Sequence, residues 1–269
     1  MIRFTDSEFE LLKTWIGQQF GIDLSKKRIL AECRMSHELE ANGFTSLRQY
    51  LTRMEQDRSG RLKAELLNRL TTNYTYFMRE PKHFEFLLDH ILPEIRPGKG
   101  RGCYRIWSAG CSSGEECYTV AMLLQDYRDR GGWLPDFEVL GTDISEKMVR
   151  KAVEAWYPVD ELEKIPVLWQ RKYCKADTEG QYFTLAPQIR SKVRFQVMNL
   201  LKPVVGISHY DLILCRNVMI YFNESSRNKL VDELYNALVP NGYLFVGHTE
   251  LLPRDHRLFQ YVCPAVYRK

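Results

Sequence analysis

The sequence predicts an α/β protein in two parts: an all-helical N-terminal domain, then a doubly wound α/β domain that carries a small antiparallel β insertion. Two observations predict this fold class. Apolar residues recur at spacings of three and four up to about residue 92, which is typical of amphipathic helices. From Cys103 onward, short apolar runs alternate with helix-length amphipathic segments, which favours a parallel sheet covered by helices. We place the domain boundary at residue 80, so that the domains are residues 1–80 and 81–269.

Five helices are predicted before the texture of the sequence changes. Ser or Asp residues at several starts can cap the helices, and Gly21 and Gly43 follow two of the ends. A stretch with two prolines and three glycines, residues 93–102, then breaks the periodicity and predicts a loop. The predicted helices are Asp6–Phe20, Ser25–Ala41, Ser46–Glu55, Ser59–Leu70 and Pro81–Ile91.

The second domain is predicted to alternate strands and helices. The strands are Tyr104–Ala109, Phe137–Thr142, Val193–Met198, Tyr210–Cys215, Tyr243–Gly247 and Phe259–Tyr267, and the helices are Glu115–Arg128, Glu146–Ala155 and Ser225–Val239. Residues 157–192 interrupt the alternation with three prolines, a turn signal at 177–180 and a strand-like run at 181–185. We interpret this interval as a small antiparallel insertion.

Composition narrows the class of protein. With 269 residues, 45% hydrophobic and 27% charged, the chain is long and apolar enough for a globular core. No apolar run is long enough to cross a bilayer and the N-terminus has no signal-peptide pattern, so we expect a cytoplasmic protein without membrane insertion. The net charge of +4 gives no indication of nucleic-acid binding. The seven cysteines form no Cys-x-x-Cys pair, so we expect reduced thiols and no metal site.

A glycine loop and two acidic positions indicate a cofactor. The predicted strand before Gly110–Gly114 and the helix after it would aim backbone amides and a helix N-terminus at a ligand. Asp143 ends the next strand, where a carboxylate can bind both hydroxyls of a ribose. Glu115 and Glu116 directly after the loop would repel a pyrophosphate but suit a cation, which favours S-adenosyl-L-methionine over a dinucleotide. The alternative is an ordinary glycine turn between a strand and a helix.

Three further polar segments stand at the ends of predicted elements. Arg216-Asn217 follows a buried strand, and Asn199-Leu200 follows another. Parallel strands bind ligands at their carboxyl ends, so Asn217 and the pair Asn199-Leu200 are candidates for a site, although Asn217 can also be read as a turn residue. The segment Asn73–Arg79 lies between two helices; its alternative interpretation is a helix cap with a surface arginine.

Six segments, in order along nearly the whole chain, resemble the chemotaxis receptor methyltransferases, the CheR family. They are Asn73-x-Thr-x-Phe-x-Arg79, Ile106–Glu116, Gly141–Ser145, Asn199–Leu201, Cys215–Phe222 and Asn241–Glu250. The resemblance implies a doubly wound S-adenosylmethionine-dependent methyltransferase domain. It also implies transfer of a methyl group from S-adenosyl-L-methionine to glutamate side chains on the cytoplasmic helices of chemoreceptors, leaving S-adenosyl-L-homocysteine.

Carried over by motif, the resemblance implies a set of site residues. The cofactor contacts would be Asn73, Thr75, Arg79, Glu116, Asp143, Asn199, Leu200, Asn217 and Val218. Arg79 and Tyr221 would lie nearest the transferred methyl. Cys117 replaces a proline that many members carry, which affects the helix start and not the chemistry. A receptor glutamate with a pKa of about 4.3 is already ionised at neutral pH, so no general base is needed. The alternatives are a cofactor-binding scaffold without transfer activity, or a small-molecule methyltransferase.

Two features bear on how a receptor would be held. Lys27 and Arg34 lie seven residues apart on one predicted helix and flank Ile29, Leu30 and Cys33, so they can steer an acidic receptor surface. The alternative is an ordinary solvated face. Some family members bind a receptor tail peptide as an edge strand of the insertion. The connection Lys175–Gln181 is short, has one glycine and no arginine, and carries two acids, so we expect direct recognition of the methylation helices. We also expect a monomer.

Overall fold

The computed structural model describes residues 2–97, 102–202 and 209–269. The chain divides into two units: Met1–Thr72 with Tyr221–Leu230, which we call the helical unit, and Asn73–Ile220 with Val231–Lys269, which we call the sheet unit. The division falls between Thr72 and Asn73, before the predicted boundary at residue 80, which stays a prediction. Part of the loop predicted at 93–102, residues 98–101, lies outside the described residues.

Four helices form the N-terminal part of the helical unit: α1 (Asp6–Phe20), α2 (Arg28–Ala41), α3 (Leu47–Gln56) and α4 (Arg61–Leu70). Helix α1 begins with a capping box, because the Thr5 hydroxyl accepts from the Glu8 N–H at 3.3 Å and the Glu8 carboxylate accepts from the Thr5 N–H at 2.8 Å. The helices face one another through fully buried apolar side chains, each of which stabilises the unit by about 1.5–3 kcal/mol. Among them are Leu12, Ile16, Met35, Leu39 and Leu66.

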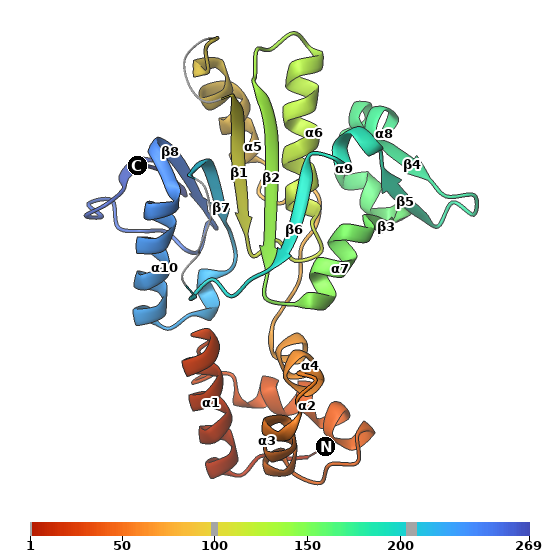
Figure 1. The fold of residues 1–269 in the computed structure, drawn as a ribbon, viewed down its shortest axis with the longest axis vertical. Helices are drawn as coiled ribbons and strands as arrows, with labels where there is room; N and C mark the ends of the chain where they lie inside the picture. Colours follow the sequence, from red (N-terminus) through yellow and green to blue (C-terminus); the bar gives the residue numbers. More distant parts are fainter. Residues whose placement is uncertain (1, 98–101, 203–208) are drawn as a thin grey trace. The chain divides into compact units, whose positions relative to one another are not determined.

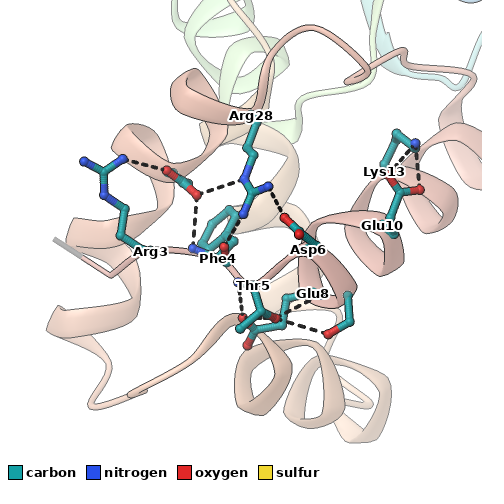
Figure 2. A network of polar contacts seen from close by, with 10 residues as sticks. Arg3, Phe4, Thr5, Asp6, Glu8, Glu10, Lys13 and Arg28 are labelled. Carbon is teal, nitrogen blue, oxygen red and sulfur yellow. Dashed lines mark hydrogen bonds and ion pairs between the residues drawn. The ribbon is translucent and has the colours of Figure 1, made fainter.

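A polar network fixes the N-terminal segment against α2 (Figure 2). The Arg28 guanidinium donates to the Phe4 carbonyl and to the Asp6 carboxylate. The buried Glu32 carboxylate accepts from the Phe4 N–H at 3.1 Å and from Arg28 Nε at 3.2 Å. Burial raises the pKa of Glu32, but these hydrogen bonds outweigh it and hold the pKa below its usual value. Glu32 is therefore a charged anchor for the start of the chain.

The sheet unit is built on a seven-stranded sheet with the order β6-β2-β1-β7-β8-β10-β9. Figure 1 labels the first five of these strands. The first five strands run parallel, and β10 pairs antiparallel with both of its neighbours. The strands are β1 (Cys103–Ala109), β2 (Asp136–Asp143), β6 (Val193–Val197), β7 (Tyr210–Cys215), β8 (Leu238–Val246), β9 (Gln260–Cys263) and β10 (Val266–Arg268). This arrangement confirms the predicted doubly wound sheet.

One strand prediction is wrong. The run Phe259–Tyr267 forms a hairpin of two strands, β9 and β10, because the chain reverses at Pro264 and Ala265. Pro264 has no N–H for a strand ladder, and Ala265 takes a left-handed φ of 65°. The apolar alternation on both sides of the turn conceals the break in the sequence.

Helices connect strands of this sheet: α6 (Glu115–Asp129), α7 (Glu146–Glu154) and α10 (Glu224–Ala237). Before the first strand, α5 (Lys82–Phe86) continues into a π-helix, η1 (Leu87–Ile91), and a 3₁₀-helix, η2 (Leu92–Glu94). The predicted helix Pro81–Ile91 therefore changes its hydrogen-bonding pattern halfway. The core includes both faces of β1 and β7. The side chains of Ile106, Trp107, Leu212 and Ile213 are at most 1% exposed, as expected for parallel strands covered on both faces.

The predicted insertion is a separate three-stranded antiparallel sheet with the order β3-β5-β4. Its elements are β3 (Trp156–Pro158), η3 (Val159–Lys164), α8 (Val167–Tyr173), β4 (Cys174–Ala176), β5 (Tyr182–Leu185) and α9 (Pro187–Arg190). The ring of Phe183 packs against Tyr157 and Phe77, with centroids 5.7 and 5.9 Å away. These contacts attach the insertion to the chain segment that carries Asn73 and Arg79.

Candidate active site

The predicted site residues of the sheet unit gather at one edge of the sheet. Gly110 follows β1, Asp143 ends β2, Asn199 lies two residues after β6 and Asn217 lies two residues after β7. The carboxyl ends of parallel strands share one edge, and the strand order reverses between β1 and β7, which is where doubly wound folds bind ligands. The loops that follow β1 and β7 touch at this reversal. Gly110 lies so close to Val218 that a Cβ added to it would be only 2.3 Å from Cγ2 of Val218.

Asp143 holds the glycine loop with its carboxylate. It accepts from the Ser112 N–H at 2.8 Å and from the Ser145 N–H at 2.9 Å, one bond to each oxygen. Burial raises the pKa of Asp143, and these backbone hydrogen bonds oppose the rise. Each carboxylate oxygen has a second lone pair, so the group can still accept from a pair of hydroxyls. The Asp143 carbonyl also accepts from Met198, at 2.9 Å, which ties down the residue before Asn199.

The segment Asn73–Glu80 is attached to the same loop. The Ser112 hydroxyl donates to the Asn73 carbonyl at 2.8 Å. Arg79 donates to the Tyr74 carbonyl at 2.8 Å, and its guanidinium lies beside the ring of Tyr76, 5.8 Å from the centroid. The residues on both sides of Arg79, Met78 and Glu80, take left-handed φ values of 59° and 56°. Strain of this kind costs on the order of 1–3 kcal/mol at each residue and is typical of functional segments.

Two adjacent acids begin α6 in different surroundings. Glu116 accepts from the Ser108 hydroxyl at 2.7 Å and lies 3.3 Å from Arg216 Nη1. Glu115 is buried and accepts from the Ser113 hydroxyl at 2.9 Å. Burial raises the pKa of Glu115 to about 7. Glu116 thus pairs with Arg216, while Glu115 packs inside.

Sequence reasoning missed three charged residues that shape this edge. Arg216 pairs with Glu80, with Nε 3.2 Å from Oε2, and Asn217 Nδ2 donates to the other oxygen of Glu80 at 3.3 Å. Glu250 accepts from the backbone N–H groups of Asn217 and Ile220, the latter at 3.0 Å. These bonds hold Asn217 in a left-handed conformation with φ 60°. An arginine directly after a buried strand was the one signal in the sequence.

Glu80 also belongs to a group of possible metal ligands. Among the described residues, Glu80, His83 and His248 place ligand atoms within 4.8 Å of one another. Burial and the Arg216 charge lower the pKa of His83 to about 3, so its imidazole is neutral. However, both oxygens of Glu80 already accept from Arg216 and Asn217. A guanidinium therefore supplies the positive charge that this carboxylate needs.

The remaining predicted residues have contacts of their own. Leu200 is buried, Asn199 accepts from the Leu201 N–H at 3.0 Å, and Thr75 is half-buried in the segment before Arg79. In the helical unit, the Lys27 ammonium lies over the Tyr221 ring, 4.8 Å from its centroid. Tyr221 and Arg79 belong to different units, and their placement beside a transferred methyl stays a prediction.

Arg34, predicted to dock the receptor, also has contacts within its own unit. It donates to the carbonyls of Leu70 and Thr71, at 3.1 and 3.3 Å, and to the Thr72 hydroxyl at 2.9 Å. These groups belong to the last residue of α4 and the two residues after it, where carbonyls lack helical partners. Between Lys27 and Arg34, the side chains of Ile29 and Leu30 are 72% and 42% exposed. The predicted apolar stripe is therefore open to solvent.

The strand order, the glycine loop and the acids at this edge define an α/β domain that binds a nucleoside cofactor. Two family models divide the chain between them: "CheR methyltransferase, all-alpha domain" matches residues 7–71, and "CheR methyltransferase, SAM binding domain" matches residues 73–267. The chain belongs to the CheR methyltransferase family. It is a methyltransferase that uses S-adenosyl-L-methionine.

Curated relatives agree with this assignment along the whole chain. The chain is 37% identical to "Chemotaxis protein methyltransferase" of Borreliella burgdorferi over 273 residues, covering 100% of this chain and 96% of the relative. It is 33% identical to "Chemotaxis protein methyltransferase" of Escherichia coli, covering 99% of this chain and 92% of the relative. It is also 33% identical to "Chemotaxis protein methyltransferase 2" of Vibrio cholerae, covering 96% and 90%.

The residues at the edge fit the cofactor. The carboxylates of Asp143 and Glu116 both lie at strand or loop ends, and both retain acceptor capacity beyond the bonds described above. The Asp143 carboxylate suits hydroxyl groups, and the Glu116 carboxylate suits an ammonium.

Within the described ranges, no helix has the length and apolar character needed to span a membrane.

Proposed function

We propose that this enzyme methylates glutamate side chains on the cytoplasmic helices of chemoreceptors, forming glutamate methyl esters in sensory adaptation. The observation that carries the proposal is the match of both parts of the chain to one family whose curated members are named chemotaxis protein methyltransferases. The proposal places the enzyme in the cytoplasm, where those helices lie.

The chemistry of the edge supports a carboxylate acceptor. Bound S-adenosyl-L-methionine supplies a methyl group on a sulfonium. A glutamate with a pKa of about 4.3 is ionised at neutral pH and can attack directly, whereas an amine or an alcohol must first lose a proton. His83 is buried and neutral, with a pKa lowered to about 3 by burial, so it is poorly suited to accept that proton near neutrality.

The chain's task is then alignment and exclusion of water. Holding two reactants in line can remove about 7–11 kcal/mol of the barrier in favourable cases. In the proposal, the Arg79 fork holds the incoming carboxylate and the Tyr221 hydroxyl aims it. Asn73, Thr75, Glu116, Asp143, Asn199, Leu200, Asn217 and Val218 hold the cofactor.

We further propose that Lys27 and the exposed residues Ile29 and Leu30 meet the receptor, with the partly exposed Arg34 in the middle of α2 contributing charge. Lys27→Gln should raise the KM for a receptor fragment more than it changes cofactor affinity, because the charge contact would be made with the partner while the ring of Tyr221 beneath Lys27 stays in place. Lys26→Gln, one residue away and exposed, is the matched control. Equal KM values for the two variants would count against docking at Lys27.

The function is tested by incubating the enzyme with methyl-labelled cofactor and receptor cytoplasmic fragments. Label that is released as methanol by mild base identifies carboxyl methyl esters. Base-stable label would instead indicate methylation of nitrogen. Label transferred only to small acids in a cell extract, with none on the receptor fragments, would favour a small-molecule methyltransferase.

A further inference from the structure

Arg216 is a buried guanidinium that contacts two predicted site residues without being one of them. It is 5% exposed and directly follows β7. Its Nη2 donates to the Arg79 carbonyl, and its Nη1 lies 3.3 Å from Glu116 Oε2. Its plane also lies over the Phe84 ring, 5.2 Å from the centroid. One side chain therefore joins the segment before α5 to the start of α6.

Glu80 completes this arrangement. Its carboxylate accepts from Arg216 Nε at 3.2 Å and from Asn217 Nδ2 at 3.3 Å. Burial raises the pKa of Glu80, but the Arg216 charge and the Asn217 hydrogen bond outweigh it, so the pKa is lowered. Glu80 and Arg216 form an ion pair in which the Arg216 side chain is buried and the Glu80 side chain is partly buried, so removing one partner would leave the other without its counter-charge.

We propose that Arg216 is a positioning residue for methyl transfer: with Glu80, it sets the backbone of Arg79 and the carboxylate of Glu116. This inference rests on the placement of Arg79 and Glu116 at the cofactor and on the proposed function. Two carboxylates, Glu80 and Glu116, face one guanidinium in this cluster.

The geometry requires an arginine. The contacts to Glu80, to the Arg79 carbonyl and to Glu116 use three different nitrogens of one plane. A lysine carries a single nitrogen on a flexible stem and cannot satisfy three separated acceptors at once. Among the described residues, Nη1 has no hydrogen-bond acceptor in good geometry, so its interaction with Glu116 is a charge contact that depends on the other two bonds.

The experiment uses the full-length enzyme with Arg216→Lys, Glu80→Gln and the double variant. Arg257→Lys is the matched control, because Arg257 pairs with Asp232 at 2.7 Å on the surface of the same unit. Calorimetry with S-adenosyl-L-homocysteine gives the affinity and the number of competent sites without any receptor. Turnover on a receptor fragment is then divided by that number, so that loss of folded protein does not count as loss of catalysis.

For Arg216→Lys we expect the affinity to fall about fivefold and turnover per competent site to fall about twentyfold or more. Glu80→Gln should also lower turnover per competent site. The turnover of the double variant should lie within about twofold of that of the less active single variant, because both changes break the same Arg216–Glu80 pair. Arg257→Lys should stay within about twofold of wild type on both measures.

Two results would overturn the proposal. The first is an Arg216→Lys enzyme with unchanged affinity and turnover per site and only a lowered melting temperature. The second is multiplication of the two single effects in the double variant. If Arg216→Lys does not fold, Glu80→Gln alone decides by the same measures. A wild-type enzyme that binds the product tightly but does not methylate receptor fragments would contradict the proposed function, while the affinity measurements would still test Arg216.

Discussion

The carboxylate of Asp143 accepts a hydrogen bond of 2.8 Å from the backbone N–H of Ser112. The end of β2 thereby holds the loop that follows β1, and Ser112 in turn donates to the Asn73 carbonyl. Three segments that are distant in sequence meet through one carboxylate and one serine. The predictions below depend on this edge and on the unit that precedes it.

Replacing Asp143 by asparagine should weaken cofactor binding. The amide nitrogen cannot accept from a backbone N–H or a hydroxyl, so at least one donor loses its partner, at a cost of about 1–3 kcal/mol. Calorimetry should therefore show an affinity for S-adenosyl-L-homocysteine lowered about 5- to 150-fold. Asp136→Asn, at the exposed start of the same strand, is the control. Equal affinities of the two variants would mean that Asp143 does not bind the cofactor.

Gly114 should resist substitution by alanine more than Gly131. Both have strongly positive φ, +95° and +86°, but only at Gly114 is the space filled: a Cβ would lie 2.9 Å from Cβ of Ala152 and 3.0 Å from the Phe195 ring. Both variants lose about 1 kcal/mol through the backbone, and overpacking should cost Gly114→Ala about 1–3 kcal/mol more. Urea unfolding measures both. Matching losses would mean that the neighbours of Gly114 move aside freely.

The buried Glu115 should make stability depend on pH. Its pKa is about 7 in the folded protein against a usual value of 4.5, because burial disfavours the charge. The folded state thus binds this proton more tightly, and the stability it contributes is present below about pH 4.5 and lost as pH rises through about 7. Relative to wild type, Glu115→Gln should gain up to about 3 kcal/mol between pH 5 and 8. Glu146→Gln, exposed in the first turn of α7, should show no such gain. A difference in unfolding free energy between Glu115→Gln and wild type that does not change with pH would contradict the prediction.

Arg34→Gln should destabilise the helical unit as well as change its charge. The side chain holds the Leu70 and Thr71 carbonyls at the end of α4, and loss of these bonds should cost about 1–3 kcal/mol of unfolding free energy. Arg53→Gln, exposed on α3, serves for comparison. Similar unfolding curves for both variants would mean that Arg34 is only a surface charge. Docking at Arg34 therefore has to be measured per folded molecule.

Removing the Tyr221 hydroxyl should lower turnover more than cofactor affinity. Tyr221→Phe keeps the ring beneath Lys27 and the backbone carbonyl that accepts from the Asp23 N–H at 2.7 Å, so only the hydroxyl is lost. We expect kcat to fall about tenfold or more with affinity within about twofold, as for a group that acts in the transition state. Tyr235→Phe is the control, since that ring lies 4.4 Å beneath Lys269 in the same way. Unchanged kcat for Tyr221→Phe would return the residue to a packing role.

Much of the fold could be predicted because helices and strands carry their periodicity locally. Helix α1 and strand β7 have the predicted bounds, Asp6–Phe20 and Tyr210–Cys215. The hairpin of β9 and β10 could not be predicted from apolar alternation, since the same alternation continues through the turn. The gathering of polar residues at the strand ends followed from the parallel topology.

The charged partners of the site could not be predicted in this way. Arg216 and Glu80 are 136 residues apart in the chain, and nothing in either neighbourhood indicates the other. Arg34 looks like a surface charge in its own helix, because its acceptors lie 36 to 38 residues later. Long-range ion pairs and caps are set by tertiary packing, which a single sequence does not display.

The most direct test of the account is to locate the methyl group on a receptor cytoplasmic fragment by tandem mass spectrometry after reaction with S-adenosyl-L-methionine. The wild-type enzyme and Asp143→Asn are compared at equal concentrations. The account predicts methyl esters on glutamate side chains of the receptor helices, sensitive to mild base and strongly reduced with Asp143→Asn. Methylation at lysine, or glutamate methylation that is undiminished in Asp143→Asn, would contradict it.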